Sequence, residues 1–441
     1  METKTAAIEM RNITKRFGPV LANDKVWLNI YRGEILALLG ENGSGKTTLM
    51  NMLSGIYFPD EGEIKIDGKE VVIRSPKDAF DNGIGMIHQH FKLVDVLTAA
   101  ENIVLGLPGK LDLKAASAKI REICDKYGFS VDPAQKIYDM SVSQKQTVEI
   151  VKVLYRGADI LILDEPTAVL TPQETDKLFA VLRNMRNDGK AIVIITHKMH
   201  EVEALSDRVA ILRHGQFIGD MLTAHTNAQE MTNMMVGHAV SLNIERPDPV
   251  DPKPRIEVKG LTVRSVDGIV KLDDVSFTAN SGEILGIAGI SGCGQKELLE
   301  AIAGLQTVES GSISYIEDDG SREELIGKDP LSIAELGVSL SFVPEDRLGM
   351  GLVGNMNLAD NMMLRSFRRG KSIFTDRRSP RALAESVVQE LSVSTPSVDT
   401  PVRRLSGGNV QKVLVGREIA SAPTVLLTAY AVRGLDIHSS Y

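Results

Sequence analysis

Short continuous apolar runs alternate with longer amphipathic segments through the first half of the chain. The runs EILALLG, DILILDEP and AIVIITH begin at residues 34, 159 and 191. Runs of this kind are typical of strands that are buried on both faces, as in a parallel sheet. The segments TTLMNMLSG and SQKQTVEIVKVLYRG space their apolar residues by three and four, which predicts helices. The alternation predicts an α/β fold with ligand-binding loops at the carboxyl ends of the strands.

The same pattern occurs a second time. Residues 32–56 read RGEILALLGENGSGKTTLMNMLSGI, and residues 281–305 read SGEILGIAGISGCGQKELLEAIAGL. Five glycines recur at one constant offset: Gly33, Gly40, Gly45, Gly55 and Gly62 match Gly282, Gly289, Gly294, Gly304 and Gly311. Glycine stands where backbone geometry or a close approach forbids a side chain. The matched glycines therefore indicate a duplicated unit.

The segment RPDPVDPKPR, residues 246–255, separates the two copies. Its four prolines and alternating charges are typical of a stiff, extended linker. We therefore predict a first domain over residues 1–245 and a second over residues 256–441, each of ordinary domain size.

Composition narrows the class of protein. The chain has 441 residues, 43% of them hydrophobic, which suffices for two or three domains with cores. A net charge of -8 argues against a nucleic-acid binder with a broad basic surface. The distant Cys124 and Cys293 form no CxxC pair, so we expect neither disulfide nor zinc site and a reducing, cytoplasmic setting. The sequence shows no signal-peptide core and no apolar run of the roughly 18 residues that a membrane span needs.

GENGSGKT, residues 40–47, matches the complete phosphate-binding P-loop pattern between a predicted strand and a predicted helix. Backbone N–H groups of such a loop surround phosphates. Lys46 is expected to reach the β- and γ-phosphates, and the Thr47 hydroxyl to ligate Mg²⁺. A glycine-rich turn with a surface lysine is the alternative, which the flanking elements disfavour. The predicted binding residues are Gly40, Glu41, Asn42, Gly43, Ser44, Gly45, Lys46, Thr47 and Thr48.

Polar side chains follow the next buried strands. LILDEP ends with Asp164, placed to hold Mg²⁺, and Glu165, placed to polarise an attacking water. Taken alone, an acidic strand end is as often structural, but the upstream P-loop makes this a specific pair. His197 follows the strand AIVIIT, and we expect it at the same sheet edge, in contact with the γ-phosphate.

Two further residues have weaker support from the pattern. Gln89 follows the short strand GIGMIH and has no assigned role by itself. Phe17 can stack on adenine, although a place in the core fits its sequence context nearly as well.

Together these motifs resemble the ABC-type ATPases. The P-loop, Gln89, a Ser-Val-Ser-Gln segment, LILDEP and His197 occur in that family's order, and LSGGN (residues 405–409) is similar to its LSGGQ signature loop. The resemblance covers nearly the whole chain. PTAVLTPQE, VPEDR and RGLD are similar to stretches of the double-cassette ATP-binding subunits of importers for simple sugars and nucleosides. IHQHFKLVDVLTAAENIVLG looks more like the nucleoside type than the ribose type.

The resemblance implies an α/β fold of two tandem P-loop NTPase domains. Each would have a mainly parallel core sheet, an antiparallel β subdomain and a helical subdomain. Two cassettes of one chain would pack head to tail, with each nucleotide between one P-loop and the other signature loop. The first site would then combine its P-loop with Ser406, Gly407 and Gly408. The implied catalytic residues are Lys46, Gln89, Glu165 and His197, and the implied metal ligands are Thr47, Gln89 and Asp164.

The second composite site would lack several parts. Gln295 replaces the P-loop lysine and Lys296 the hydroxyl residue. In the first half, Val142 and Ser143 replace both signature glycines, and VLLTAYAVRGLD places Ala429 and Tyr430 at the acidic pair. Losses confined to one site indicate specialisation, with one hydrolytic and one degenerate site.

Two features limit the transfer from the family, and one basic segment has two interpretations. Thr171 stands where many cassettes have Asp, a change common in this branch. The last strand, the histidine loop and the closing hairpin of the second domain would fall beyond Tyr441, so the chain is expected to be either a fragment or a naturally truncated protein. The basic run 365–381 is either a solvated loop or a contact to anionic lipid headgroups.

We therefore expect an ATPase that uses ATP and Mg²⁺ to energise import of a simple sugar or nucleoside. Its partners would be membrane permease subunits and, indirectly, a solute-binding protein, at the cytoplasmic face of the membrane, without nucleic acid. A soluble tandem cassette ATPase acting on ribosomes or nucleic acid is the alternative enzyme. A regulator that binds ATP without hydrolysing it is the non-enzymatic alternative.

Overall fold

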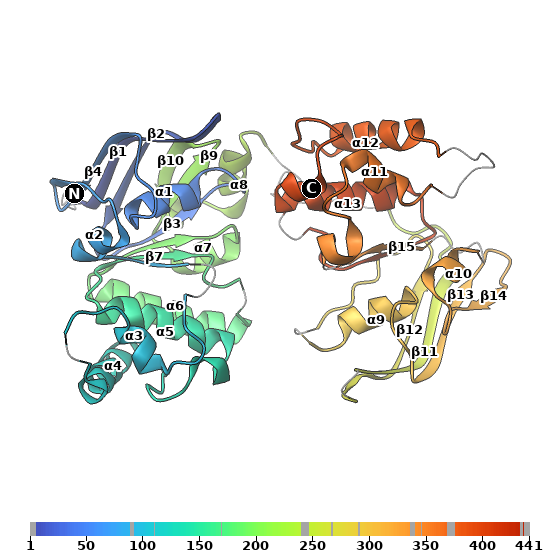
Figure 1. Cartoon of the computed structure of the whole chain (residues 1–441), viewed down its shortest axis with the longest axis horizontal. Coiled ribbons are helices and arrows are strands. Elements are labelled where there is room, and N and C mark those ends of the chain that lie inside the picture. The colour runs from blue at the N-terminus through green and yellow to red at the C-terminus, as the bar shows by residue number, and fades with distance from the viewer. Residues whose placement is uncertain are drawn as a thin grey trace. The chain divides into compact units, whose positions relative to one another are not determined.

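The computed structural model describes residues 6–88, 92–109, 111–168, 170–239, 247–265, 268–289, 292–335, 340–344, 346–367, 375–432 and 435. The chain divides into two compact units, Met1–Leu242 and Asn243–Tyr441 (Figure 1). Each unit is described by itself.

Two sheets build the first unit. The antiparallel sheet has the order β2-β1-β4-β5 and the larger sheet the order β10-β9-β3-β8-β7-β6. Strands β6, β7, β8, β3 and β9 run parallel, and β10 pairs antiparallel with β9. The strands are β1 (Ala6–Phe17), β2 (Val20–Tyr31), β3 (Ile35–Leu39), β4 (Glu61–Ile66), β5 (Lys69–Val71), β6 (Ile84–Ile87), β7 (Ile160–Asp164), β8 (Ala191–Ile195), β9 (Arg208–Arg213) and β10 (Gln216–Leu222).

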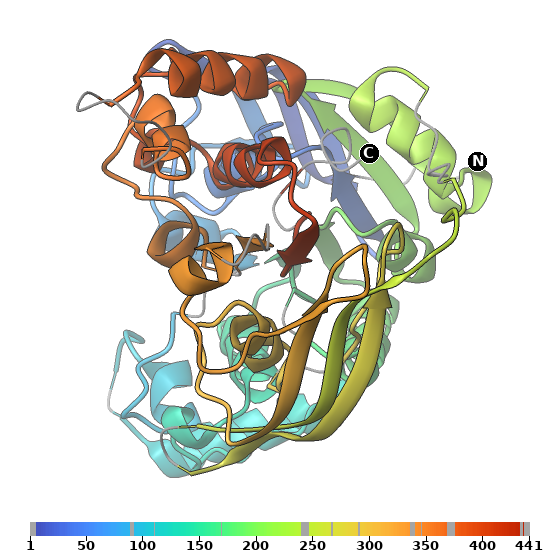
Figure 2. The same ribbon diagram turned by 90° about the vertical axis from the view of Figure 1, so that its right-hand side faces the viewer.

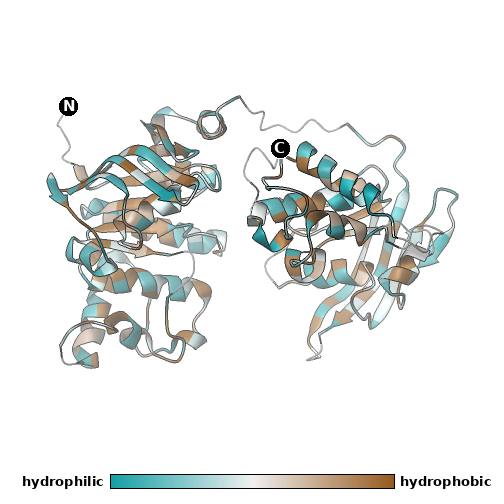
Figure 3. Ribbon diagram, turned by 45° about the horizontal axis from the view of Figure 1, so that its top comes forward, coloured by the Kyte–Doolittle hydropathy of each residue, from teal (hydrophilic) through white to brown (hydrophobic). Residues whose placement is uncertain are grey.

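The apolar runs occupy the centre of the parallel sheet, as the sequence predicts. Every residue of β3, β7 and β8 is buried. In contrast, β2 alternates buried and more exposed residues, which is expected of a sheet with one face on the core. Figure 3 shows hydrophilic and hydrophobic positions mixed along the strands and helices. One hydrophobic cluster joins residues of both sheets to the helix that follows β3. This shared core fixes the start of that helix relative to the strand ends.

The helices of the first unit form two groups. Helices α3, α4 and α5 gather at the end away from the antiparallel sheet, around a small core of their own (Figure 1). The others accompany the sheets. The bounds are α1 (Lys46–Leu53), α2 (Pro76–Asp81), α3 (Ala99–Val104), α4 (Leu113–Tyr127), α5 (Val142–Tyr155), α6 (Pro172–Asn187), α7 (Met199–Leu205) and α8 (Ala228–Val236).

The second unit repeats the antiparallel sheet in the same order, β12-β11-β13-β14, and helix α9 packs against it (Figure 2). Strands β15 and β16 pair in parallel. The strands are β11 (Pro254–Arg264), β12 (Val270–Asn280), β13 (Ser310–Ile316), β14 (Arg322–Glu324), β15 (Leu340–Val343) and β16 (Val425–Thr428). The helices are α9 (Gln295–Ile302), α10 (Pro330–Glu335), α11 (Leu358–Met363), α12 (Arg378–Glu390) and α13 (Gly407–Ala420).

The duplication extends to single buried side chains. Asn102 on α3 accepts the Val94 N–H at 2.7 Å and donates to the carbonyl of the same residue at 3.0 Å. Asn361 on α11 makes the same pair of bonds to Val353, at 2.8 and 3.1 Å. A buried amide that both accepts from and donates to one backbone position holds the chain in place at the entry to each helix. The two helical subdomains therefore begin in the same way.

The second unit differs at the stretch that matches β3. Residues 283–289 are described but form no strand, and Ile284, Leu285 and Ile287 are exposed by 77%, 44% and 41%. In the first unit β3 lies between β8 and β9, which satisfy its backbone on both sides. In the described part of the second unit the parallel sheet consists of β15 and β16, and residues 283–289 pair with neither strand.

Candidate functional site

The loop between β3 and α1 is packed so closely that two of its glycines are obligatory. A Cβ at Gly40 would lie 2.3 Å from the Leu212 carbonyl oxygen, and one at Gly45 would lie 2.3 Å from the Ala22 carbonyl oxygen. Gly45 also has φ +95° as the N-cap of α1. Any side chain there would be both strained and obstructed. The loop therefore delivers backbone N–H groups to the start of α1, the arrangement that binds anions.

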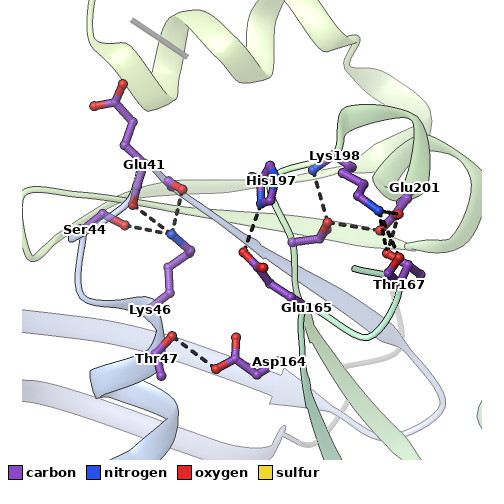
Figure 4. A network of polar contacts seen from close by, with 12 residues as sticks. Glu41, Ser44, Lys46, Thr47, Asp164, Glu165, Thr167, His197, Lys198 and Glu201 are labelled. Carbon is purple, nitrogen blue, oxygen red and sulfur yellow. Dashed lines mark hydrogen bonds and ion pairs between the residues drawn. The ribbon is translucent and has the colours of Figure 1, made fainter. Parts of the chain in front are cut away.

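Lys46 folds over this loop and is 8% exposed. Its Nζ donates to the carbonyl oxygens of Gly40 at 2.7 Å and Glu41 at 2.8 Å (Figure 4). Burial lowers the pKa of Lys46 to about 8, and the carboxylates of Glu165, Asp164 and Glu41 oppose that shift. The ammonium is thus held at the loop, where a bound phosphate would place its charge.

An oxygen pair suited to a divalent cation lies below the lysine (Figure 4). Asp164 ends β7, and its Oδ2 accepts a hydrogen bond from the Thr47 hydroxyl at 3.3 Å. Burial raises the pKa of Asp164. A carboxylate and a hydroxyl fit Mg²⁺, which keeps several waters and binds few protein ligands beside substrate phosphates. The described residues hold no cluster of three or more His, Cys, Asp or Glu side chains that would form a cage for a metal.

Glu165 and His197 meet at the same edge because β7 and β8 are neighbours in the sheet. Nδ1 of His197 lies 3.0 Å from Oε1 of Glu165. The hydrogen bond from His197 lowers the pKa of Glu165 and outweighs the opposing effect of burial. An ionised carboxylate with a directed partner is the form that a general base requires. Glu165 also has φ +46°, an uncommon conformation for a non-glycine residue.

Phe17 lies at the end of β1 and is 41% exposed, so it does not belong to the core. Tyr57 meets its ring edge-on, with ring centroids 5.1 Å apart. The Lys15 ammonium also lies over the ring, 5.5 Å from its centroid, and the ring remains partly accessible, as a stacking platform needs to be. Gln89, which the sequence analysis assigned to catalysis and to metal binding, lies outside the described residues.

Among its described residues, the second copy of the loop has a glycine N-cap like that of the first copy but no lysine at the position of Lys46. Gly294 has φ +96° at the N-cap of α9. A Cβ added there would lie 2.3 Å from the Lys271 carbonyl oxygen, as close as a Cβ at Gly45 would lie to that of Ala22. Gln295 Nε2 donates to the carbonyl oxygens of Ile287 at 3.2 Å and Gly289 at 3.4 Å. The Gly289 bond matches that from Lys46 to Gly40. The amide thus replaces the lysine in hydrogen bonding without supplying a cation.

The turn after β16 likewise keeps its form without its acids. Tyr430 stands at the position of Glu165 and has φ +53°, and Ala429 stands at that of Asp164. Gln146 donates to a carbonyl of the first turn at 2.6 Å, and Gln411 donates to one of the second at 2.7 Å. Residues 429–432, the described part of the second turn, include no carboxylate for a metal or a water.

In the signature segments it is the second unit that keeps the family residues and the first unit that has lost them. Ser406 caps α13 by accepting the Asn409 N–H at 3.4 Å, and Gly407 and Gly408 are the first residues of that helix. In the first unit Ser141 caps α5 in the same way. The glycine positions there hold Val142, which is 45% exposed, and Ser143.

Glu201, to which no sequence motif assigns a role, belongs to the hydrogen-bonded network around the site (Figure 4). Glu201 is 2% exposed and lies on the buried face of α7 with Val202 and Leu205. A glutamate in register with buried apolar residues is the signal that could have identified it, because Glu is almost never fully buried unless it is paired.

The loop, its lysine and the acidic strand end define a P-loop nucleotide-binding protein. The family model for the ABC transporter matches residues 23–168 and 272–428. The nucleoside import ATP-binding protein NupA of Lactococcus lactis is 44% identical and covers 98% of this chain and 85% of its own length. The guanosine import ATP-binding protein NupO of Bacillus subtilis is 43% identical, with coverages of 98% and 84%.

The ribose import ATP-binding protein of Rubrobacter xylanophilus is 40% identical over 98% of this chain and 85% of its own. A nucleotide-free ATP-binding cassette of an ABC transporter, a solved structure, is 24% identical, with coverages of 52% and 95% and a TM-score of 0.46. The chain belongs to the ABC transporter family, and the expected fold of two ABC cassettes is confirmed.

Nucleotide binding is expected to become proton-linked at alkaline pH. Because the pKa of Lys46 is about 8 in the unliganded loop and phosphate charge raises it, binding at pH 9 takes up close to one proton. Affinity for ATP should therefore fall by up to tenfold per pH unit above pH 8. Calorimetry at pH 9 in buffers of different ionisation enthalpy measures the uptake. A heat of binding that does not depend on the buffer would contradict the proton linkage. As the control, Lys46→Ala should bind ATP more weakly and without taking up a proton.

Proposed function

We propose that this chain is the ATP-hydrolysing subunit that energises an importer of nucleosides or simple sugars. The observation that carries the proposal is the single sheet edge at which Lys46, the Thr47–Asp164 pair and the Glu165–His197 pair meet. The names of the relatives, which are import ATP-binding proteins for nucleosides, guanosine and ribose, support the class of transported solute.

The roles follow from the positions in the first unit. Lys46 binds the β- and γ-phosphates, Glu165 accepts a proton from the attacking water, and His197 orients Glu165 and contacts the γ-phosphate. Phe17 stacks on the adenine ring. The remaining phosphate contacts come from Gly40, Glu41, Asn42, Gly43, Ser44, Gly45, Thr47 and Thr48.

Mg²⁺ would be held by Thr47 and Asp164, with Gln89 as the further ligand and catalytic residue that the family pattern implies. When bound, the ion neutralises phosphate charge. Ser406, Gly407 and Gly408 are assigned to binding a nucleotide phosphate through the amino end of α13. Gln295, Ala429 and Tyr430 cannot supply the cation, the metal ligand and the base, so hydrolysis is assigned to the first P-loop alone.

Transport requires partners that cross the membrane. Among the described residues, no helix is long and apolar enough to span a bilayer. We therefore propose that permease subunits supply the pathway, that this chain binds them at the cytoplasmic face, and that a solute-binding protein acts through them.

Affinity purification from detergent-extracted membranes tests this function. A tagged chain is expected to retain integral-membrane permease subunits, and Lys46→Ala to retain them equally, because docking does not require hydrolysis. In cells that depend on the chain, Lys46→Ala should abolish uptake of labelled nucleoside or ribose. Retention of ribosomal RNA or DNA in place of permease subunits would contradict the proposal and favour the alternative enzyme.

A further inference from the structure

A buried carboxylate lies beside the Glu165–His197 pair and gathers three donors. Oε1 of Glu201 accepts a hydrogen bond from the Thr167 hydroxyl and pairs with the Lys198 ammonium at 2.9 Å. Its Oε2 accepts a bond from the Thr196 hydroxyl at 3.1 Å (Figure 4). With 2% of Glu201 exposed, these contacts replace water at the carboxylate almost completely.

The donors come from two different loops. Thr167 follows Glu165 by two residues in the segment after β7, whereas Thr196 directly precedes His197 in the segment after β8. Lys198 follows His197 and also donates to the Thr167 carbonyl oxygen at 3.2 Å. One carboxylate therefore ties together the two segments that carry the catalytic pair.

The energetics favour one arrangement of these loops. A buried carboxylate is stable only when donors satisfy it. Removing it would leave the hydroxyls of Thr167 and Thr196, both 3% exposed, without their acceptor. The loops would then rearrange to satisfy those groups. The first quantity to change would be the 3.0 Å separation between His197 and Glu165.

The second unit lacks the donor that matches Thr167. Val432 stands at that position, 58% exposed, two residues after the Tyr430 that replaces the glutamate. The hydroxyl is thus present with the acidic pair and absent without it. The occurrence of the hydroxyl only beside the acidic pair favours a role for Thr167 in hydrolysis over a general role in holding the end of the strand.

We propose that Glu201 is a positioning residue: it holds the segments after β7 and β8 in one register and so keeps His197 within hydrogen-bonding distance of Glu165. This inference rests on the proposed function, because that pair is the machinery for hydrolysis. Glu201 itself touches neither nucleotide nor water in this role.

Glu201→Gln in the full chain is the direct test. The amide keeps the size of the side chain but turns an NH₂ group toward a donor. Because misplacement by about 1 Å can cost 10²-fold, kcat should fall about ten- to a hundredfold, with KM for ATP unchanged within about twofold. Glu203→Gln is the matched control on the same helix, where an exposed carboxylate accepts the Ala228 N–H, and should leave both constants unchanged.

Two further measurements separate positioning from a loss of folding. Thr167→Val should lower kcat in the same direction, and Thr167→Ser, which restores the hydroxyl, should recover it. In a His197→Ala background, Glu201→Gln should lower kcat by no more than about twofold further, because the group through which it acts is already gone. A full additional loss in that background would overturn the proposal.

The outcomes also distinguish the two levels of inference. A native chain that hydrolyses ATP, with normal kcat in Glu201→Gln, overturns the positioning role and leaves the proposed function intact. A native chain that hydrolyses no ATP, even with its copurified permease subunits, overturns both.

Discussion

Lys46→Ala should reduce ATP hydrolysis to background. The variant removes the ammonium that contacts the carbonyl oxygens of Gly40 and Glu41 and that would face the transferred phosphate. A positive charge that is already in place beside the negative charge developing on the transferred phosphate contributes about 10²–10³-fold to kcat. Binding of ATP should weaken as well. Initial rates over a range of ATP concentrations, with a nucleotide-binding isotherm, separate the two losses.

Gln295→Ala is the matched control, because Gln295 makes the corresponding bond to Gly289 in the second loop. The amide carries no charge, so its removal should change turnover by no more than about twofold. If Gln295→Ala stopped hydrolysis as completely as Lys46→Ala, the assignment of hydrolysis to the first P-loop would be wrong. A comparison of both variants at saturating ATP gives the clearest contrast.

Glu165→Gln should lower kcat by about 10²–10⁴-fold while ATP binding persists. The hydrogen bond from His197 lowers the pKa of Glu165, so the carboxylate is ionised at neutral pH and can accept a proton. An amide of the same shape keeps a contact to His197 but accepts no proton. Single-turnover assays should show bound, uncleaved ATP that remains associated with the chain.

The control for this variant is Tyr430→Phe at the matching position of the second unit. It should leave turnover within about twofold of the native rate. Retention of substantial hydrolysis by Glu165→Gln would mean that another group accepts the proton, and the assignment of the base would fail.

Much of the fold was predictable because its signals are local. β3, β7 and β8 are continuous aliphatic runs, and the structure buries every one of their residues. The P-loop was predictable for the same reason, since its glycines are required by close contacts within a short segment. The second loop could be located in the sequence because its glycines repeat the spacing of the first.

Other features depend on contacts between distant segments, which a pattern along the chain does not contain. The burial of Glu201 depends on Thr167, which lies 34 residues away in the sequence. The edge-on contact between Phe17 and Tyr57 likewise joins two separate segments of the chain. Ile284 and Leu285 are exposed although their own sequence favours a buried strand, because residues 283–289 pair with no strand among the described residues.

The left-handed backbone at Tyr430 changes how the same geometry at Glu165 should be understood. Glu165 has φ +46° and Tyr430 has φ +53°, yet only Glu165 has a proposed catalytic role. Unfavourable torsion at a catalytic glutamate is commonly taken as energy reserved for the reaction. Here Tyr430 adopts nearly the same torsion, so the torsion belongs to a turn that both units share and is no evidence for the proposed catalytic role of Glu165.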